Sequence, residues 1–351
     1  MKQQTVRFGV IGTGKITGKF LASAVHCEGF VLSAVCSRNA ETGQAFAEEY
    51  GAQAVFTNPR EMAASGVIDA AYIASPTAKH YEQAKILLEN GISVLCEKPF
   101  VTNSREAEEL IRIAEERGVF VMEAMRSLAM PGFLAVKEYL PSLGKIRRVF
   151  SSKCQYSSRY DRFKEGIVEN AFIKELSNGA LMDIGRYCVA PVIELFGMPE
   201  KVMAGAQFLS TGVDAQGTAV LSYGDMDCVL LYSKVSDSLL PFEIQGEDGI
   251  LTADDIYEFR NVRISYRDGR TETLDLDDSD PSEKAASAGV DDNTIHVGPL
   301  VMTYEIREFL RCVREGQTDS PLVSHAQTLS SMRVMDEIRR QIGLVYPADC
   351  L

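Results

Sequence analysis

Residues 6–20 read VRFGVIGTGKITGKF: an apolar run, two glycines and then an amphipathic segment. The run predicts a buried strand and the segment after Gly14 predicts a helix, so the glycines occupy a strand-to-helix turn. Gly12 would permit a tight turn, and Gly14 would let the backbone approach a pyrophosphate at the positive end of the helix. Thr17 occupies the third position of the G-x-G-x-x-G fingerprint, so the match is partial. A plain tight connection is the alternative interpretation.

The rest of the first 125 residues repeats the alternation of strand and helix. Short apolar runs predict strands at 30–37, 52–56, 69–75, 93–97 and 119–124. Helical patterns between them end at Gly51, Gly91 and Gly118, which suits a left-handed cap. Such alternation predicts a parallel sheet covered on both faces, with ligands bound outside the carboxyl ends of its strands. We therefore predict a dinucleotide-binding Rossmann domain over residues 1–125.

The pattern changes in residues 126–351, which predict a second α/β domain with an open, mostly antiparallel sheet. Long β-like segments are 145–157, 201–209, 217–224, 226–234, 242–253 and 261–276. Helical patterns cover 132–140, 180–197, 300–315 and 324–341. The polar stretch 275–293 is predicted to be a mobile loop.

The composition excludes several classes of protein. A chain of 351 residues with 46% hydrophobic content suits about two globular domains. Its net charge of -13 argues against a nucleic-acid partner, and no apolar run approaches the roughly 20 residues that span a bilayer. The N-terminus lacks a signal-peptide layout. The eight cysteines form no Cys-x-x-Cys pair, and the histidines and acids show no metal-ligand spacing. We expect a cytoplasmic protein with reduced thiols, no metal and no membrane partner.

The residues after the second predicted strand indicate which dinucleotide is bound. A site that prefers NAD usually has Asp or Glu there, to hold the ribose 2′-hydroxyl. This chain has Ser37-Arg38, a hydroxyl and a guanidinium that would bind a 2′-phosphate. The predicted cofactor is therefore NADP. NAD is the alternative, because Arg38 could instead be solvated or stack on the adenine.

The fifth predicted strand ends in Glu97-Lys98-Pro99, at the edge of the sheet where a nicotinamide would lie. Together with the glycine turn, IASPTAKH (73–80) and NGALMDIGRY (178–187), this motif makes nearly the whole chain resemble the Gfo/Idh/MocA oxidoreductases. The resemblance implies that Lys98 is a catalytic residue and that Asp183 contacts the substrate. In the family the open sheet commonly forms a dimer interface, so a homodimer or higher homo-oligomer is expected.

The motif around Asp183 departs from the commonest family pattern. Tyr187 stands where most members have a proton-transferring histidine, which resembles the branch of dimeric dihydrodiol dehydrogenases, glucose-fructose oxidoreductase and some xylose dehydrogenases. EAMR (123–126) resembles the same branch. Dihydrodiol members often carry tryptophan where this chain has Arg126, and the chain has no tryptophan. This difference favours a polar or anionic sugar over an aromatic diol.

The residue chemistry supports the same roles. Asp183 and Tyr187 are spaced i and i+4 and would share a helix face. Tyrosine is a poor base at a pKa of about 10, but a nearby ammonium favours the phenolate. Lys98 or the oxidised nicotinamide ring could supply that charge. Tyr187, or Lys98 through it, would then take the alcohol proton while Asp183 orients a substrate hydroxyl. The structural alternatives are a surface lysine, a helix-start acid and a core tyrosine.

Further contacts are expected around these motifs. The predicted cofactor set is Gly12, Thr13, Gly14, Lys15, Ile16, Ser37, Arg38, Ser75, Pro76, Thr77, His80, Glu97, Lys98 and Arg126. Pro76 and Thr77 would turn the backbone beside the cofactor, whereas His80 either lines the nicotinamide side or only starts a helix. Tyr156 and Arg159 follow the first predicted strand of the second domain, where the resemblance implies a substrate wall.

The predicted reaction is reversible hydride transfer between NADP(H) and a carbinol of a sugar, polyol or cyclic diol. An NAD-linked inositol-type dehydrogenase is one alternative, against which Tyr187 and Ser37-Arg38 count. A non-catalytic dinucleotide-sensing regulator is another, because one fold can host unrelated functions. The presence of Lys98, Asp183 and Tyr187 together counts against a regulator.

Overall fold

The computed structural model describes residues 4–274, 276 and 302–350. The chain divides into two compact units, which are described separately. The first unit comprises Met1–Val101, Arg105–Arg126 and Asp277–His325, and the second comprises Thr102–Ser104, Ser127–Leu276 and Ala326–Leu351. The boundary between residues 125 and 126 stays a prediction; of the late described residues, 302–325 group with the first unit. The loop predicted over 275–293 lies outside the described residues, apart from residue 276.

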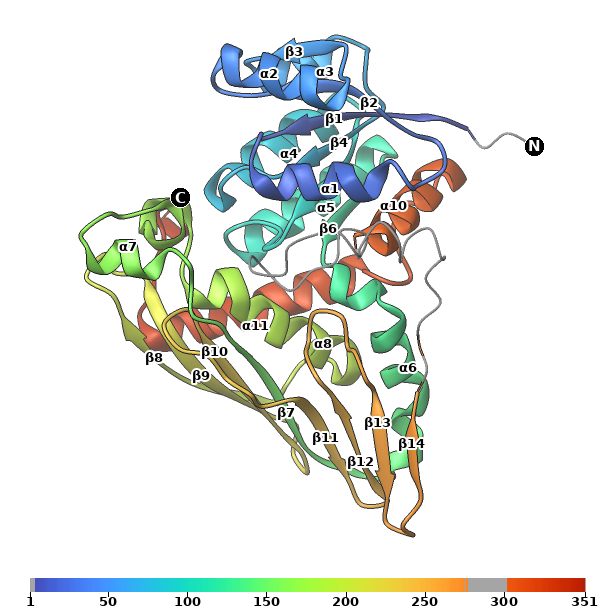
Figure 1. Cartoon of the computed structure of the whole chain (residues 1–351), viewed down its shortest axis with the longest axis vertical. Helices are drawn as coiled ribbons and strands as arrows, with labels where there is room; N and C mark the ends of the chain where they lie inside the picture. The colour runs from blue at the N-terminus through green and yellow to red at the C-terminus, as the bar shows by residue number, and fades with distance from the viewer. Residues whose placement is uncertain (1–3, 275, 277–301, 351) are drawn as a thin grey trace. The chain divides into compact units, whose positions relative to one another are not determined.

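The first unit is built on a six-stranded parallel sheet in the order β3-β2-β1-β4-β5-β6 (Figure 1). Its strands are β1 (Val6–Ile11), β2 (Phe30–Cys36), β3 (Ala54–Phe56), β4 (Ala70–Ile73), β5 (Ser93–Glu97) and β6 (Val121–Ala124). Its helices are α1 (Lys15–Ala24), α2 (Ala40–Tyr50), α3 (Pro59–Ala64), η1 (Thr77–Lys79), α4 (His80–Glu89), α5 (Ser104–Arg117) and α10 (Thr303–Glu315). The predicted parallel Rossmann sheet is confirmed. Gly51, Gly91 and Gly118 all have positive φ, as their predicted capping role requires.

Aromatic packing fixes α10 to this sheet although almost 180 residues separate it from β6. Phe309 of α10 contacts Phe8 of β1 and Phe120, with ring centroids 5.7 and 5.3 Å apart. All three rings are buried, and burial of one such side chain contributes roughly 1.5–3 kcal/mol. The helix starts at residue 303 rather than 300, but the predicted helix itself is confirmed.

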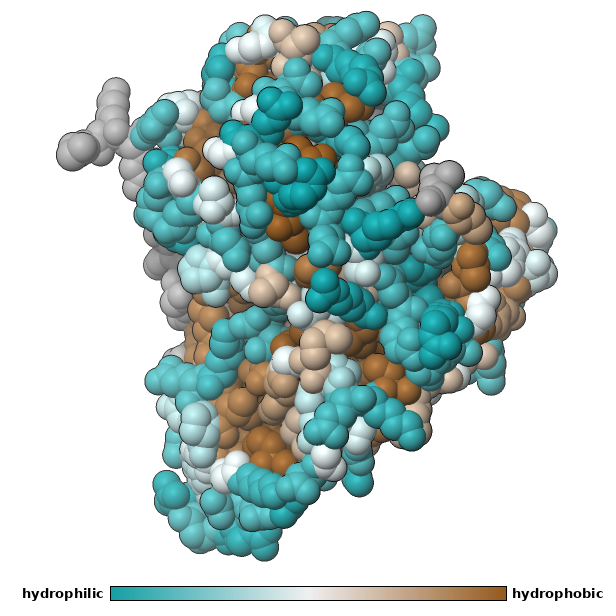
Figure 2. Space-filling model, turned by 180° about the vertical axis from the view of Figure 1, so that it is seen from behind, coloured by the Kyte–Doolittle hydropathy of each residue, from teal (hydrophilic) through white to brown (hydrophobic). Residues whose placement is uncertain are grey.

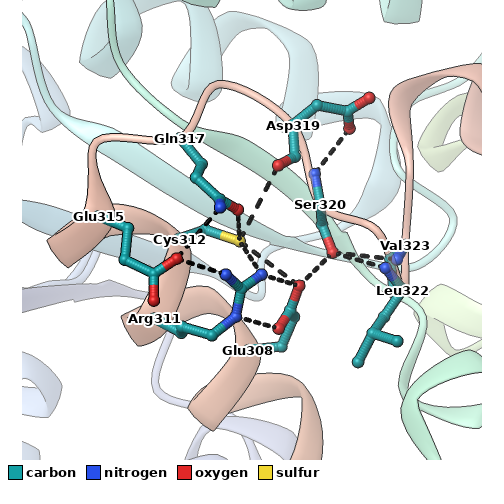
Figure 3. A network of polar contacts seen from close by, with 9 residues as sticks. All are labelled: Glu308, Arg311, Cys312, Glu315, Gln317, Asp319, Ser320, Leu322 and Val323. Atoms are coloured by element: carbon teal, nitrogen blue, oxygen red, sulfur yellow. Dashed lines mark hydrogen bonds and ion pairs between the residues drawn. The ribbon is translucent and has the colours of Figure 1, made fainter.

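The C-terminal end of α10 is fixed by a polar network (Figure 3). The guanidinium of Arg311 donates two hydrogen bonds of 2.9 Å to the carboxylate of Glu308, which also accepts from the Ser320 hydroxyl. Burial opposes ionisation of Glu308, but the bonds from Arg311 and Ser320 outweigh it and lower the pKa of this carboxyl. The network therefore links the helix to the segment that follows it.

The second unit is built on an eight-stranded sheet in the order β14-β13-β12-β11-β7-β10-β9-β8. Its strands are β7 (Ile146–Cys154), β8 (Lys201–Phe208), β9 (Asp214–Ser222), β10 (Asp227–Ser233), β11 (Phe242–Gly246), β12 (Gly249–Ala253), β13 (Arg263–Tyr266) and β14 (Thr271–Thr273). Among the described strand pairs of this second sheet only β7–β10 is parallel, so the predicted mostly antiparallel sheet is confirmed.

Helices cover one face of this sheet. The helices around this sheet are α6 (Pro131–Tyr139), α7 (Tyr160–Lys164), α8 (Arg186–Phe196) and α11 (His325–Ile342), with short 3-10 helices η2 (Arg126–Ala129), η3 (Leu140–Leu143), η4 (Asn170–Phe172), η5 (Lys174–Leu176) and η7 (Pro347–Cys350). α8 packs on β7 and β10, and Figure 1 shows α6 and α11 on the same side of the sheet. No helix in the described part of the chain is long and apolar enough to cross a membrane.

The opposite face of the sheet carries a row of apolar side chains. The strand register places Met203, Val220, Val229 and Phe150 next to one another across β8, β9, β10 and β7. Each of these residues is half-buried or exposed. In its lower part, Figure 2 shows apolar surface bordered by hydrophilic residues.

Candidate active site

The glycine turn after β1 has the geometry of a phosphate-binding turn. Gly12 has a φ of 102°, and a Cβ there would lie 2.7 Å from the carbonyl oxygen of Ala74, so only glycine fits. A Cβ at Gly14 would meet nothing within 4 Å, which leaves open space in front of the helix. Thr17, at the third fingerprint position, is buried and donates a 2.9 Å hydrogen bond to the Gly12 carbonyl. The threonine therefore stabilises the turn from inside.

The N-terminus of α1 has the features that favour binding of an anion. Its N-cap is Gly14, which has no side chain to cap the helix, and no acid lies in the first turn. Burial and the positive charges of Arg126 and Lys15 lower the pKa of Lys19. Mutual repulsion among these cations would be relieved by a bound phosphate. The residues present therefore fit the pyrophosphate of a dinucleotide.

Ser37 and Arg38, the predicted contacts of the 2′-phosphate, follow directly after β2. Ser37 is nearly buried and its backbone N–H donates to the carbonyl of Phe56, while Arg38 is exposed. Asn39 caps α2 by accepting a 2.9 Å hydrogen bond from the N–H of Thr42. The guanidinium of Arg38 is thus at the surface, beside a helix that is already capped.

His80 is buried at the start of α4. Its Nε2 lies 2.8 Å from the carbonyl oxygen of Ser75, and its Nδ1 lies 3.1 Å from that of Pro99. Burial lowers the pKa of His80, although the contacts with carbonyls oppose this effect. Both ring nitrogens are engaged by backbone, so His80 joins the turn after β4 to the turn after β5. The Ser75 hydroxyl itself donates to the side chain of Gln83.

The Glu97-Lys98-Pro99 motif follows β5, next to β4 and one strand further from β1. The carboxyl ends of these three parallel strands therefore bring the glycine turn, the Ser75 segment and Lys98 to one edge of the sheet. The Lys98–Pro99 peptide bond is cis. Glu97 is buried, accepts a 2.6 Å hydrogen bond from the Tyr72 hydroxyl, and accepts another from the N–H of Lys98.

Behind this motif lies a buried acidic cluster that sequence reasoning missed. Glu123 accepts a hydrogen bond from the N–H of Phe100, and Glu305 of α10 is fully buried nearby. Within the described part of the chain, neither carboxyl oxygen of Glu305 has a hydrogen-bond partner. Burial and the charge of Glu97 raise the pKa of Glu305 well above its usual value, against an opposing effect of Arg126. Arg126, a predicted cofactor contact, is itself buried among these carboxyls.

In the second unit, Asp183 lies in a π-helical turn, Leu181–Gly185, that leads directly into α8. The helix predicted over 180–197 is therefore present, but its first turn is wound more loosely than an α-helix. The side chain of Asp183 is 35% exposed, and its Oδ2 lies 2.5 Å from the Nζ of Lys234. Such π-turns are frequent at functional sites.

The start of this turn is held by a second acid that the sequence did not single out. Asp214, the first residue of β9, is fully buried and accepts a 2.6 Å hydrogen bond from the N–H of Leu181. Burial raises the pKa of Asp214 to about 6, although hydrogen bonds from the backbone and the charge of Lys234 oppose the rise. Asp214 and Lys234 are far apart in sequence from Asp183, so only the folded sheet reveals the cluster.

Tyr187 is largely buried in the first turn of α8. Its ring meets the ring of Tyr257 edge to face, with centroids 4.3 Å apart and an interplanar angle of 89°. The ammonium of Lys153 lies 3.8 Å from the centroid of the Tyr257 ring. Tyr187 therefore has a fixed ring orientation and a cation one ring away, and neither neighbour was predicted.

Tyr156 and Arg159 lie after β7 in the second unit. The Tyr156 hydroxyl donates to Asp161, and the guanidinium of Arg159 pairs with Glu169 at 3.3 Å. The predicted site residues thus form two groups. The cofactor set and Lys98 belong to the first unit, whereas Asp183, Tyr187, Tyr156 and Arg159 belong to the second.

Comparison with known proteins matches both parts of the chain to one family. Residues 6–125 match the oxidoreductase family with an NAD-binding Rossmann fold, and residues 134–252 match the GFO/IDH/MocA C-terminal domain. The chain belongs to the Gfo/Idh/MocA oxidoreductases. It is thus an NAD(P)-dependent dehydrogenase or reductase that acts on CH–OH groups.

Several relatives match over nearly their whole length. The chain is 45% identical to scyllo-inositol 2-dehydrogenase (NADP(+)) IolU of Bacillus subtilis, covering 98% of this chain and 99% of the relative. It is 28% identical to trans-1,2-dihydrobenzene-1,2-diol dehydrogenase of Xenopus tropicalis, covering 97% of this chain and 99% of that one. The solved structure of KijD10, a 3-ketoreductase from Actinomadura kijaniata, in complex with NADP and TDP-benzene, is similar with a TM-score of 0.80 at 22% identity, covering 98% and 99% of the chains. That structural likeness shows the same fold.

Proposed function

We propose that the chain is an NADP-dependent dehydrogenase of cyclic polyols, with an inositol as the first candidate substrate. The observation that carries the proposal is the position of Lys98 at the sheet edge that also holds the open, uncapped turn at Gly14. The named activity of the Bacillus relative supports both the NADP and the inositol. Tyr187 and Ser37-Arg38 count against an NAD-linked inositol dehydrogenase. They do not count against an inositol substrate as such, because the Bacillus relative is named an inositol dehydrogenase that uses NADP.

The proposed cofactor contacts follow from the first unit. The backbone from Gly12 to Ile16 would bind the pyrophosphate, and Ser37 with Arg38 would bind the 2′-phosphate. The bound nicotinamide would supply the hydride acceptor. Fit is supported by the open space at Gly14 and by the crowded cations around Lys19.

The proposed proton pathway uses Lys98 and Tyr187. The phenolate of Tyr187 takes the proton of the reacting hydroxyl, and the charge of Lys98 favours that phenolate over the neutral phenol. The carboxylate of Asp183 accepts a hydrogen bond from a substrate hydroxyl and thereby orients the ring. In reduction the same groups return the proton to the alkoxide.

A neutral substrate fits the structure better than an anionic one. The expectation of an anionic sugar depended on Arg126, but this guanidinium is buried and interacts with the carboxyls of Glu97 and Glu305. Its charge therefore acts on carboxyls of its own unit, which leaves it less available to an anionic substrate. A cyclic polyol instead offers several hydroxyls, which suit acceptors such as Asp183.

Absorbance at 340 nm tests the reaction. We expect turnover of scyllo-inositol or another inositol with NADP, with a lower rate with NAD, and loss of turnover in Lys98→Met and Tyr187→Phe. Trans-dihydrodiols and sugar acids serve as comparison substrates. Tight NADPH binding by calorimetry without turnover on any polyol or carbonyl compound would contradict an enzyme and favour the regulator.

We further propose a homodimer formed through the apolar row Met203, Val220, Val229 and Phe150. The row lies on the sheet face opposite α8. In a symmetric dimer, the same row of a second copy would cover these apolar side chains. Val229→Asp should lower the mass measured by light scattering from dimer to monomer, whereas Thr218→Asp, an already exposed neighbour on the same face, should do so less. An unchanged mass in both variants would contradict this interface.

Six buried thiols among the eight free cysteines support a reducing compartment such as the cytoplasm.

A further inference from the structure

Lys234 is a lysine in an unusual environment. It follows β10, and its side chain is only 4% exposed. Its N–H donates to the carbonyl of Ala215, and its carbonyl accepts from the N–H of Ser157, at 2.9 Å each. The backbone of Lys234 is therefore fixed between the strand β9 and the segment after β7.

The ammonium of Lys234 points to Asp183. Its Nζ donates a 2.5 Å hydrogen bond to Oδ2 of Asp183 and lies 5.1 Å from the centroid of the Phe172 ring. It also acts on the buried carboxyl of Asp214 by its charge. A buried ammonium without a carboxylate partner is strongly unfavourable, so this pair depends on Asp183 being where it is.

Asp183 and Lys234 differ in exposure, and this difference indicates which of them can contact a ligand and which can only position the other. Asp183 is 35% exposed, so its carboxylate can meet both Lys234 and a ligand, whereas Lys234 is enclosed by protein. A lysine that cannot reach a substrate acts on one only through the residue it holds.

We propose that Lys234 is a positioning residue, whose buried ammonium holds the carboxylate of Asp183 in the orientation that accepts a hydroxyl of the polyol. The inference rests on the proposed function, since it takes Asp183 as the substrate contact. It assigns a role to a residue that no sequence motif marks.

A stability cycle tests the pair without any substrate. Asp183→Asn leaves the enclosed ammonium facing a neutral amide, with only the charge of Asp214 to oppose its own, whereas Lys234→Met leaves Asp183 as a carboxylate that water can reach. We therefore expect the melting temperature to fall more in Asp183→Asn than in Lys234→Met. The double variant should melt at a higher temperature than Asp183→Asn alone. Additive losses would overturn the inference.

Kinetics test the positioning role. Lys234→Met should lower kcat/KM for the polyol about 100-fold, because small misplacements of an orienting group have effects of this size. Lys234→Arg should recover most of the loss, since a guanidinium can also donate to Asp183. In the Asp183→Asn background, Lys234→Met should change kcat/KM by less than about threefold. Full additivity, or no rescue by arginine, would overturn the role.

Two controls separate this role from general destabilisation. Lys137→Met breaks the 2.5 Å pair with Glu194 near the other end of α8, and should leave kcat/KM within about twofold. The dissociation constant of NADPH should be equal in Lys234→Met and wild type, because the proposed cofactor contacts belong to the first unit. A weaker NADPH complex in Lys234→Met would overturn a role limited to Asp183. A wild type without polyol turnover would overturn the proposed function, while the stability cycle would still decide the pair.

Discussion

The buried carboxyl of Asp214 should make the stability of the protein fall as pH rises. Its pKa is about 6 in the folded protein and 3.8 as the ordinary value, so the folded state holds the proton more tightly than the unfolded state. The stabilisation is therefore fully present below pH 3.8 and is lost as pH rises through about 6. The difference of about 2 pKa units corresponds to about 3 kcal/mol of unfolding free energy, with most of the change between pH 4 and 6.

Urea unfolding of wild type and Asp214→Asn from pH 4 to 7.5 measures this effect. Asparagine can still accept the hydrogen bond from the N–H of Leu181 but does not titrate. The difference in unfolding free energy between the two proteins should shift in favour of Asp214→Asn by up to about 3 kcal/mol as pH rises. Asp225→Asn is a matched control, because Asp225 is exposed and paired with Lys145, which lowers its pKa. Parallel pH curves for wild type and Asp214→Asn would refute the reasoning.

Further predictions concern the cofactor turn and the buried tyrosine. Gly12→Ala should lower the unfolding free energy by about 1–3 kcal/mol, because alanine disfavours this positive φ and its Cβ would clash with the carbonyl oxygen of Ala74. Gly14→Ala should fold normally, because its Cβ would meet open space, yet it should weaken NADPH binding measured by calorimetry. Arg38→Asp should weaken NADP more than tenfold while changing NAD little, and equal losses for both would contradict the 2′-phosphate contact. Tyr257→Ala should lower kcat, because the ring of Tyr187 loses its edge-to-face contact, whereas Tyr257→Phe should keep the wild-type kcat. An equal kcat in Tyr257→Ala and wild type would contradict a role of Tyr257 in fixing the ring of Tyr187.

Local patterns were sufficient for most of the fold. The runs at 6–11 and 93–97 coincide with β1 and β5 because short apolar stretches between helical patterns have few other solutions. The grouping of α10 with the first unit could not be predicted, because it depends on Phe309 meeting Phe8 across 301 positions of sequence. The π-turn was missed because an apolar helical pattern does not distinguish it from an α-helix.

The candidate site was predictable only where a motif marks it. Lys98 and Asp183 were found by their place in family motifs, and their proposed roles remain predictions. Lys234 has no such mark, because it is one more residue at the end of an alternating strand. Glu305 comes from a helix whose polar residues look solvated in sequence, although this one is buried. Burial of a charge is a property of the tertiary fold, and periodicity does not report it.

The position of α10 has a consequence for the order in which the protein is made. A ribosome finishes β6 at residue 124 long before it reaches the start of α10 at residue 303. Until then the nascent first unit lacks Phe309, and the apolar surface around Phe8 and Phe120 has no cover from that ring. A fragment that stops at residue 126 would carry the same defect permanently. We therefore expect a transplant of the nucleotide-binding unit to be more stable when it includes α10 than when it ends at residue 126.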